Sequence, residues 1–304
     1  MPELPEIGLY LHALRPRVEG KILQGIRIRS PSLLKSFDPP IAEANGKAVQ
    51  SLLRLGKRVV FGLEDDLYIV VHLMISGRFQ WMAPGVAVPR KRGQAGFDFD
   101  DGTLLLTEAS SHKRASLHLV RGREALAAHD PGGVEPLEVS LAEFAEAVRS
   151  ENRTLKRALT DPRMLSGIGN AHSDEILLKS RLSPVKRTGQ LSDDEMERLY
   201  ASTQASLKEW SELLIAEAGD SFPKKVTAFH PAMWAHGKYG EPCPQCGTKI
   251  QRIVYAKRET NYCPSCQTKG RLLADRALSR LLREDWPRTV EELEALRRDP
   301  NEAG

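Results

Sequence analysis

The chain has 304 residues, of which 41% are hydrophobic and 28% are charged. These fractions exclude a wholly disordered chain and are typical of a soluble globular protein with more than one domain. Lys and Arg number 44 against 40 Asp and Glu, so the net charge of +4 identifies no class of partner by itself.

No segment predicts a membrane span or a secretion signal. The longest apolar run, residues 67–75, is far shorter than the roughly 20 residues that a spanning helix needs. The first residues lack the basic and apolar regions of a signal peptide. We therefore expect a cytoplasmic protein with no membrane partner.

The first 130 residues predict one helix followed by β-structure. Apolar residues recur at helical spacing over residues 5–18, on a face formed by Ile7, Tyr10, Leu11, Leu14 and Val18. Short apolar or alternating runs at 47–63, 67–82 and 97–107 predict strands. The pair Asp101-Gly102 predicts a hairpin turn.

A turn-rich stretch at residues 130–136 predicts a domain boundary. The pattern after it predicts helices over residues 141–149, 153–160, 171–180 and 193–218. Residues 167–170 form a glycine-rich turn that opens the third of these helices. Residues 219–240 have no clear period and predict a long loop.

Four cysteines form two close pairs with sixteen residues between them: Cys243, Cys246, Cys263 and Cys266. This spacing is typical of a zinc site with four thiolate ligands. Two disulfides are the alternative, which a reducing compartment disfavours. We expect one structural Zn²⁺, because four protein ligands leave no open position for chemistry.

The cysteine region is basic. Residues 237–283 contain ten Lys or Arg and three acidic residues, an excess of seven positive charges. Balancing a negative thiolate cluster explains about two of these, so the excess favours a nucleic-acid backbone as partner. Residues 284–304 have an excess of four negative charges, and no site is expected there.

The N-terminus contains groups that can form a Schiff base. When Met1 is removed, Pro2 presents a secondary amine, and an α-amino pKa near 8 leaves a useful neutral fraction at pH 7. Glu3 and Glu6 lie one helical turn apart and could divide acid and base roles. From these residues alone, an ordinary charged terminus is the alternative.

This opening resembles that of the formamidopyrimidine-DNA glycosylase / endonuclease VIII family of bifunctional base-excision enzymes. Five further segments resemble the family in the same order, at residues 55–58, 72–77, 133–137, 167–176 and 239–266. The resemblance implies an α+β, multidomain fold. Its parts are an N-terminal antiparallel β-sandwich with a terminal helix (1–132), a helical helix–two-turn–helix domain with a lid-like loop at 219–236 (133–236), a C-terminal β-hairpin zinc finger (237–283) and an acidic tail (284–304).

The resemblance also implies roles for the N-terminal residues. Pro2 is the nucleophile that attacks the sugar C1′, Glu3 is the acid or base, and Glu6 supports that chemistry. Lys57 contacts phosphate and the lesion, although taken alone it would be an ordinary surface lysine. The implied reaction removes an oxidised base and nicks the strand by β- and δ-elimination, with no small-molecule cofactor.

Two residues in the second half are implied to hold the phosphates of the extruded nucleotide. Asn170 follows the glycine-rich turn, where it would act as a helix cap, as a phosphate ligand or as both. Arg258 lies five residues before Cys263, where its guanidinium would clamp phosphate. The alternative is that Arg258 is one more basic residue of the finger.

The chain departs from the family where a wedge fills the gap left by the extruded base. The wedge methionine of the purine-specific branch aligns best with Ile75, with Met74 just before it. In the second wedge loop, Lys113 or Arg114 would serve as the arginine, but Ala115 stands where an aromatic residue is expected.

Ile75 or Met74 would then act as the wedge alone, with His112 or Lys113 probing the opposite base. The aromatic residues of the loop at 219–240 either stack on a base or pack the loop. Oxidised purines, oxidised pyrimidines, abasic sites and single-stranded lesions therefore all stay open as the preferred substrate.

We expect a monomeric DNA glycosylase and AP lyase that acts on damaged double-stranded DNA. The first alternative is a relative that binds damaged DNA without turning it over. A zinc-ribbon transcription or translation factor is the second alternative, which explains the cysteines but not the N-terminus.

Overall fold

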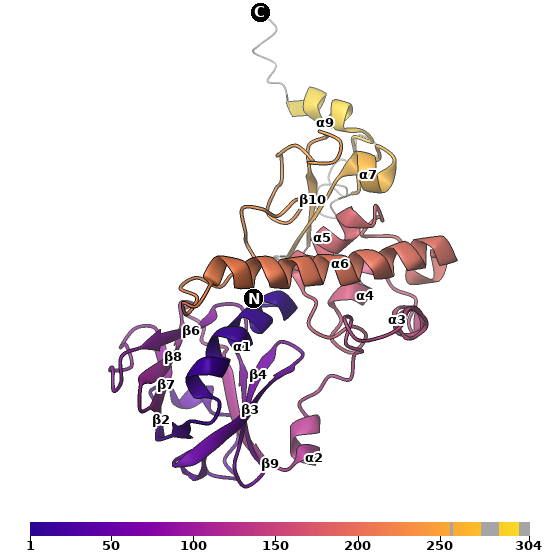
Figure 1. Ribbon diagram of the computed structural model, residues 1–304. Coiled ribbons are helices and arrows are strands. Elements are labelled where there is room, and N and C mark those ends of the chain that lie inside the picture. The colour runs from indigo at the N-terminus through magenta and orange to yellow at the C-terminus, as the bar shows by residue number, and fades with distance from the viewer. Residues whose placement is uncertain (256–257, 275–285, 298–304) are drawn as a thin grey trace, which may run out of the picture. The chain divides into compact units, whose positions relative to one another are not determined.

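The computed structural model describes residues 1–255, 258–274 and 286–297 (Figure 1). The chain divides into two compact units. The first comprises Met1–Glu135 and Leu207–Ala228, and the second Pro136–Ser206 and Phe229–Gly304. Among the described residues, no helix combines the length and apolar character that a membrane span requires.

The first unit contains helix α1 (Leu4–Val18) and two antiparallel sheets (Figure 1). One sheet has the order β1 (Ile22–Leu23), β3 (Lys47–Leu55), β4 (Arg58–Leu63), β5 (Leu67–His72) and β9 (Ser116–Arg121). The other has the order β2 (Gly25–Ile28), β7 (Gly93–Phe99), β8 (Gly102–Glu108) and β6 (Gly77–Met82). The β-structure predicted for the three apolar runs is confirmed, whereas β1, β2, β9 and the short helix α2 (Arg123–Ala127) were not predicted.

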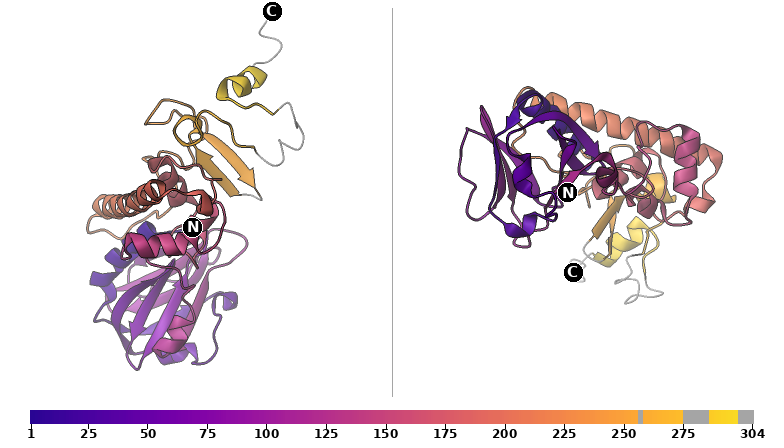
Figure 2. Two further views of the ribbon diagram at one scale, coloured as in Figure 1. Left: turned by 90° about the vertical axis from the view of Figure 1, so that its right-hand side faces the viewer. Right: turned by 90° about the horizontal axis from the view of Figure 1, so that it is seen from below.

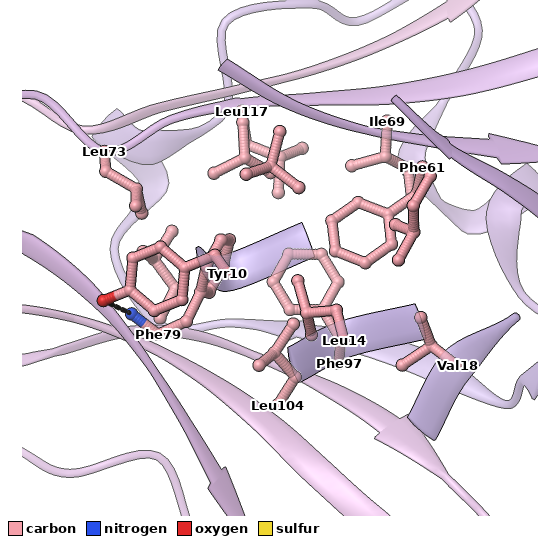
Figure 3. Close-up of a cluster of buried hydrophobic side chains, with 14 of the residues drawn as sticks. Tyr10, Leu14, Val18, Phe61, Ile69, Leu73, Phe79, Phe97, Leu104 and Leu117 are labelled. Carbon is pink, nitrogen blue, oxygen red and sulfur yellow. Dashed lines mark hydrogen bonds between the residues drawn. The ribbon is translucent and has the colours of Figure 1, made fainter. Parts of the chain in front are cut away.

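Helix α1 begins one residue before its predicted start, and its whole predicted face is buried in the core of this unit. Tyr10 packs edge-on against Phe79 with the ring centroids 5.4 Å apart, and its hydroxyl accepts a hydrogen bond from the Phe79 backbone N–H at 3.2 Å (Figure 3). Leu14 lies in the same cluster and is fully buried. Each such side chain contributes about 1.5–3 kcal/mol, so the core holds the start of the chain in place.

The hairpin between β7 and β8 turns one residue earlier than predicted. Phe99 pairs with Gly102, so the turn residues are Asp100 and Asp101. Gly102 begins β8, where a Cβ atom would lie 2.4 Å from the Trp81 ring. The glycine is therefore needed for the close approach of Trp81 and not for the turn.

The second unit is helical, with a small hairpin. It contains α3 (Leu141–Arg149), α4 (Leu155–Thr160), α5 (Asn170–Lys179), the first part of α6 (Asp193–Ala218), β10 (Gln251–Tyr255), β11 (Arg258–Tyr262), α7 (Pro264–Thr268) and α9 (Val290–Arg297). The predicted bounds of α3 and α6 are confirmed, and α4 starts two residues late because Thr154 precedes it as its cap. The structure describes every residue of 219–240 and places no helix or strand there, as predicted. Figure 2 shows the β10–β11 hairpin as two orange arrows.

Candidate active site and metal centre

The N-terminal end of α1 carries two buried carboxylates. Glu3, 2% exposed, is the extended residue that precedes the helix, and Glu6, 1% exposed, lies in its first turn. The Glu6 carboxylate accepts a hydrogen bond from the Glu3 backbone N–H at 2.7 Å. The positive end of the helix dipole favours carboxylates at this place. The structure thus holds both acids beside Pro2, which is also buried.

The terminal amine lies among charged side chains of the same unit. Burial has the largest effect on the pKa of the Met1 α-amino group and makes it lower than usual. Glu3 and Glu6 raise this pKa, whereas Arg78 and Lys57 lower it. Sequence reasoning missed Arg78, whose only signal was its place directly after the segment 72–77.

Lys57 lies in the tight turn between β3 and β4. Leu55 pairs with Arg58, which leaves Gly56 and Lys57 as the two turn residues. Gly56 has a φ of 60°, a left-handed conformation that suits glycine. Arg54 donates a hydrogen bond to the Gly56 carbonyl at 2.9 Å and so braces the turn.

The turn after β5 separates the two wedge candidates. Burial, with Arg58 and Lys57, lowers the pKa of His72 to about 4, so its imidazole is neutral and Nδ1 accepts a hydrogen bond from the Met74 backbone N–H at 2.9 Å. Met74 takes a left-handed φ of 52°. Ile75 is 60% exposed, whereas Met74 is half-buried. Of the two, Ile75 is therefore the side chain that projects from the turn.

The loop after β8 is organised by a carboxylate that sequence reasoning did not single out. Glu108 is 1% exposed and accepts hydrogen bonds from the backbone N–H groups of Arg114 at 3.0 Å and Ala115 at 3.2 Å. Ala115 is buried in the core, so it does not project as a wedge. The Lys113 ammonium group donates a hydrogen bond to the Glu108 carbonyl, while Arg114 is exposed.

In the second unit, the glycine-rich turn opens α5 as predicted, but the cap is one residue earlier than expected. Gly169 is the capping residue, so the interpretation of Asn170 as the cap is wrong. Asn170 is the first helical residue, and its side-chain amide donates to the Glu259 carbonyl at 2.8 Å. The Asn170 amide therefore joins the start of α5 to β11.

Helix α5 also carries two buried acids that hold other parts of this unit. Asp174 accepts hydrogen bonds from Lys156 Nζ at 2.5 Å and contacts His236 Nδ1 at 2.8 Å. Glu175 accepts from three successive backbone N–H groups, those of residues 234–236, at 2.9 Å each. Sequence reasoning missed these residues, and the available signal was two adjacent acids directly before the apolar run at residues 176–178.

The four cysteines form one cluster whose sulfur atoms all lie within 4.8 Å of one another. Tetrahedral ligands at a Zn–S distance of about 2.3 Å are about 3.8 Å apart. The Sγ atoms of Cys243 and Cys266 are 4.0 Å apart and those of Cys246 and Cys263 are 3.4 Å apart, in agreement with that geometry. All four are free thiols, so the alternative of two disulfides is wrong.

The predicted site residues belong to both units. Pro2, Glu3, Glu6 and Lys57 gather in the first unit, and the projecting Ile75 belongs to it as well. Asn170 and Arg258 belong to the second unit, where α5 contacts β11 through the Asn170 amide. Arg258 is the first residue of β11 and pairs with Tyr255, and its side chain lies outside the described part of the chain.

Three sequence families match the chain in order. Residues 1–131 match the formamidopyrimidine-DNA glycosylase N-terminal domain, residues 133–213 match the H2TH domain of the same enzymes, and residues 240–269 match the zinc finger found in FPG and IleRS. The last match agrees with the four-cysteine cluster and with one structural zinc.

Full-length relatives and solved structures agree with these matches. The chain is 31% identical to a formamidopyrimidine-DNA glycosylase of Heliobacterium modesticaldum and 30% identical to one of Thermus thermophilus, over 88% and 89% of this chain and all of each relative. It is similar to the Lactococcus lactis enzyme bound to DNA with an abasic site (TM-score 0.76, 27% identity, 88% of this chain, 99% of that one). It is also similar to MutM bound to DNA containing carbocyclic 8-oxo-G (TM-score 0.77, 27% identity, 88% of this chain, 100% of that one). The chain therefore belongs to the formamidopyrimidine-DNA glycosylase family.

Proposed function

We propose that this base-excision-repair DNA glycosylase and AP lyase uses the amine of Pro2, freed by removal of Met1, as its nucleophile. The observation that carries the proposal is the buried pair of Glu3 and Glu6 beside Pro2, which is itself buried. A neutral secondary amine can attack a sugar carbon, and carboxylates beside it can give and take the protons that the steps require.

The reaction follows from this arrangement. The Pro2 nitrogen forms a bond to C1′ of the damaged nucleotide, and the bond from C1′ to the base breaks, with the base taking the electron pair and a proton. Glu3 protonates the ring oxygen as the deoxyribose opens, which yields the iminium ion. Loss of a C2′ proton then expels the 3′-phosphate, and a second elimination expels the 5′-phosphate. Glu6 supports these steps by holding Glu3 through its backbone N–H.

The DNA contacts are assigned by position. Lys57, Asn170 and Arg258 bind phosphates around the extruded nucleotide, and the helix N-terminus at Asn170 attracts an anion. Ile75 fills the gap in the duplex, with Met74 as the alternative wedge residue. We also assign DNA contacts to Lys113 and Arg114, which lie on the loop after β8.

The zinc ion holds the finger. The thiolates of Cys243, Cys246, Cys263 and Cys266 would hold one Zn²⁺, which would stabilise the hairpin that bears Arg258 and leave no open position for substrate.

Oxidised bases and abasic sites are the proposed substrates. Similar enzymes have been crystallised with DNA containing carbocyclic 8-oxo-G and with DNA containing an oxidised pyrimidine, which supports both classes of base. We place the domain boundaries at residues 132, 236 and 283. We expect the enzyme to act as a monomer in the cytoplasm of a bacterial-type cell, in association with the nucleoid.

Borohydride trapping tests the nucleophile. The protein without Met1 is incubated with duplexes that contain an abasic site, 8-oxoguanine opposite cytosine, or 5-hydroxyuracil. We expect a covalent band on the abasic duplex, and the relative bands on the two lesions rank the substrates. Three altered proteins should still bind DNA but lose all or most of the covalent band. They are a protein that keeps an extra residue before Pro2, the variant Pro2→Gly and the variant Glu3→Gln.

A matched control is Glu43→Gln, which removes an exposed carboxylate from the same unit and should leave the band unchanged. DNA binding by the parent protein with no band on any duplex would overturn the proposal. That result would favour the alternative of a protein that binds damaged DNA without turnover.

A further inference from the structure

The end of the described chain lies on the zinc finger. Residues after 269 lie outside the three matched families, and the proposed function uses none of them. The structure describes residues 270–274 and 286–297 of this region. The second stretch, which we call the C-terminal segment, contains α9 and bonds to residues beside the cysteines.

The C-terminal segment has an ordered start. The Thr289 hydroxyl accepts a hydrogen bond from the Glu292 N–H at 3.3 Å, and the Glu292 carboxylate accepts one from the Arg288 N–H at 2.6 Å. These bonds cap α9 and fix the direction in which the chain enters it. Pro287 is buried and Trp286 is half-buried, so the residues before the helix are packed against the protein.

One side chain of α9 bonds beside the first cysteine pair. The Lys249 ammonium group donates to the Glu294 carboxylate at 2.6 Å. Lys249 lies three residues after Cys246, and its backbone pairs antiparallel with Pro242, the residue directly before Cys243. The ion pair therefore holds the chain on both sides of the first cysteine pair.

The start of the same segment is bonded beside the second cysteine pair. The Arg288 carbonyl accepts a hydrogen bond from the Leu272 N–H at 2.8 Å, and the next N–H, that of Leu273, donates to the Tyr262 hydroxyl at 2.8 Å. Tyr262 is 1% exposed and directly precedes Cys263. Leu272 is 5% exposed, so this connection runs through a buried part of the finger.

The two sets of bonds meet at one end of the β10–β11 hairpin. Gln251 of β10 pairs with Tyr262 of β11 at the end nearest the cysteines. The C-terminal segment thus connects the two strands, through Glu294 and Lys249 on one side and through Arg288 on the other.

Release of a zinc ion requires the two cysteine pairs to move apart. Cys246 is exposed, so water and chelators can reach its sulfur atom in the folded protein. After this ligand is exchanged, the other thiolates must separate before the ion can leave. A segment that is bonded beside both pairs opposes that separation.

We propose that the C-terminal segment braces the zinc finger and slows the release of Zn²⁺ from the four cysteines. Glu294 acts through Lys249, and the Arg288 carbonyl acts through Leu272 and Tyr262. The proposal concerns retention of the metal and takes nothing from the proposed chemistry on DNA.

The test is the rate at which the zinc-loaded full chain gives up its metal to a chromophoric chelator in excess. In Glu294→Gln we expect release to be about 3- to 5-fold faster, which is the effect of one partly exposed ion pair. In Tyr262→Phe the Leu273 N–H loses its acceptor, and we expect release to be about 10-fold faster. Glu291→Gln removes an exposed charge from the same helix and should release zinc at the parent rate.

Exchange of the two charges tests the pair itself. Lys249→Glu alone should release zinc faster than the parent, and the double variant Lys249→Glu/Glu294→Lys should restore most of the parent rate. In the zinc-loaded Glu294→Gln protein, hydrogen exchange should become faster at residues 251 and 262 and stay unchanged in α3.

Parent-like zinc release in both Glu294→Gln and Tyr262→Phe would overturn the proposal. So would equal acceleration in Glu291→Gln, which would assign the effect to the net charge of the segment, or a double variant no slower than Lys249→Glu. These measurements use neither DNA nor turnover. A failure of borohydride trapping would therefore overturn the proposed function without affecting this result.

Discussion

Both carboxylate oxygens of Glu108 lie 3.0 Å from the backbone nitrogen of Arg114. The Ser76 hydroxyl donates to the same carboxylate at 3.3 Å, so one buried acid ties the loop after β8 to the turn that carries Ile75. Residues from two separate connections are thereby held in one arrangement at the edge of the proposed active site.

Replacing this acid should loosen both connections. In Glu108→Gln, an amide NH₂ group replaces an acceptor and meets the N–H groups of Arg114 and Ala115, so at least one buried donor loses its partner. We expect the free energy of unfolding to fall by about 2–4 kcal/mol. Urea denaturation measures the loss, and hydrogen exchange should become faster at residues 114 and 115. Glu124→Gln, at an exposed position, should change neither, and unchanged protection in Glu108→Gln would show that the carboxylate is not the organiser.

Ile75 should matter for opening the duplex and not for the chemistry on the sugar. In Ile75→Ala, no side chain fills the gap that the extruded base leaves in the stack, which destabilises the opened duplex by a few kcal/mol. We expect excision of a lesion from a duplex to slow about 10- to 100-fold, while borohydride trapping on a single-stranded abasic oligonucleotide is unchanged. Ile22→Ala removes another exposed isoleucine of the same unit and is the control. Equal loss on both substrates would contradict the wedge role.

The low pKa of His72 predicts that the folded protein loses stability in mild acid. Its pKa is about 4 in the folded protein against an ordinary 6.5, so the unfolded chain binds more protons between these values. The free energy of unfolding therefore falls as the pH drops below 6.5, by about 2 kcal/mol at pH 5 from this residue. In His72→Asn, the amide oxygen can still accept from the Met74 N–H but does not titrate.

The measurement is the difference in unfolding free energy between pH 7.5 and pH 5. We expect this difference to be smaller in His72→Asn than in the parent by that amount, whereas His112→Asn, at an exposed position, should match the parent. The same pH dependence in parent and His72→Asn would mean that His72 titrates normally.

Removal of zinc should abolish the finger while leaving the first unit folded. The thiolate cluster holds α7 and the β10–β11 hairpin, and a structural zinc site contributes about 10–16 kcal/mol to folding. After chelation we expect rapid hydrogen exchange in β10 and β11, retained protection in β4 and β5, and a loss of DNA affinity of about 10-fold or more. Added Zn²⁺ should restore binding and added Mg²⁺ should not. Undiminished DNA affinity of the chelated protein would argue against a role for the finger in binding.

Local patterns were sufficient for the framework of the fold. The apolar spacing of residues 5–18 predicted the buried face of α1, and the helical pattern of the sequence predicted the bounds of α3 and α6. The cysteine spacing predicted the metal ligands. These features succeed because the geometry of one helix or one turn depends on neighbouring residues only.

The site itself needed contacts between distant segments. The sequence favoured Ile75 by alignment but kept Met74 as a wedge candidate, and the structure showed that Ile75 projects from the turn whereas Met74, with a left-handed φ, is half-buried. It could not show that Ala115 is buried, or that Arg78 lies near the terminal amine.

The sequence by itself determined the family, the order of the elements and the chemistry available at Pro2, Glu3 and the cysteines. The tertiary structure alone decided which acids are buried, as at Glu108 and Glu175, and which cations share a pocket, as with Arg78 and Lys224. The physical reason is that burial and charge clustering depend on strand register and on loops that return from far along the chain. No local pattern contains those distances.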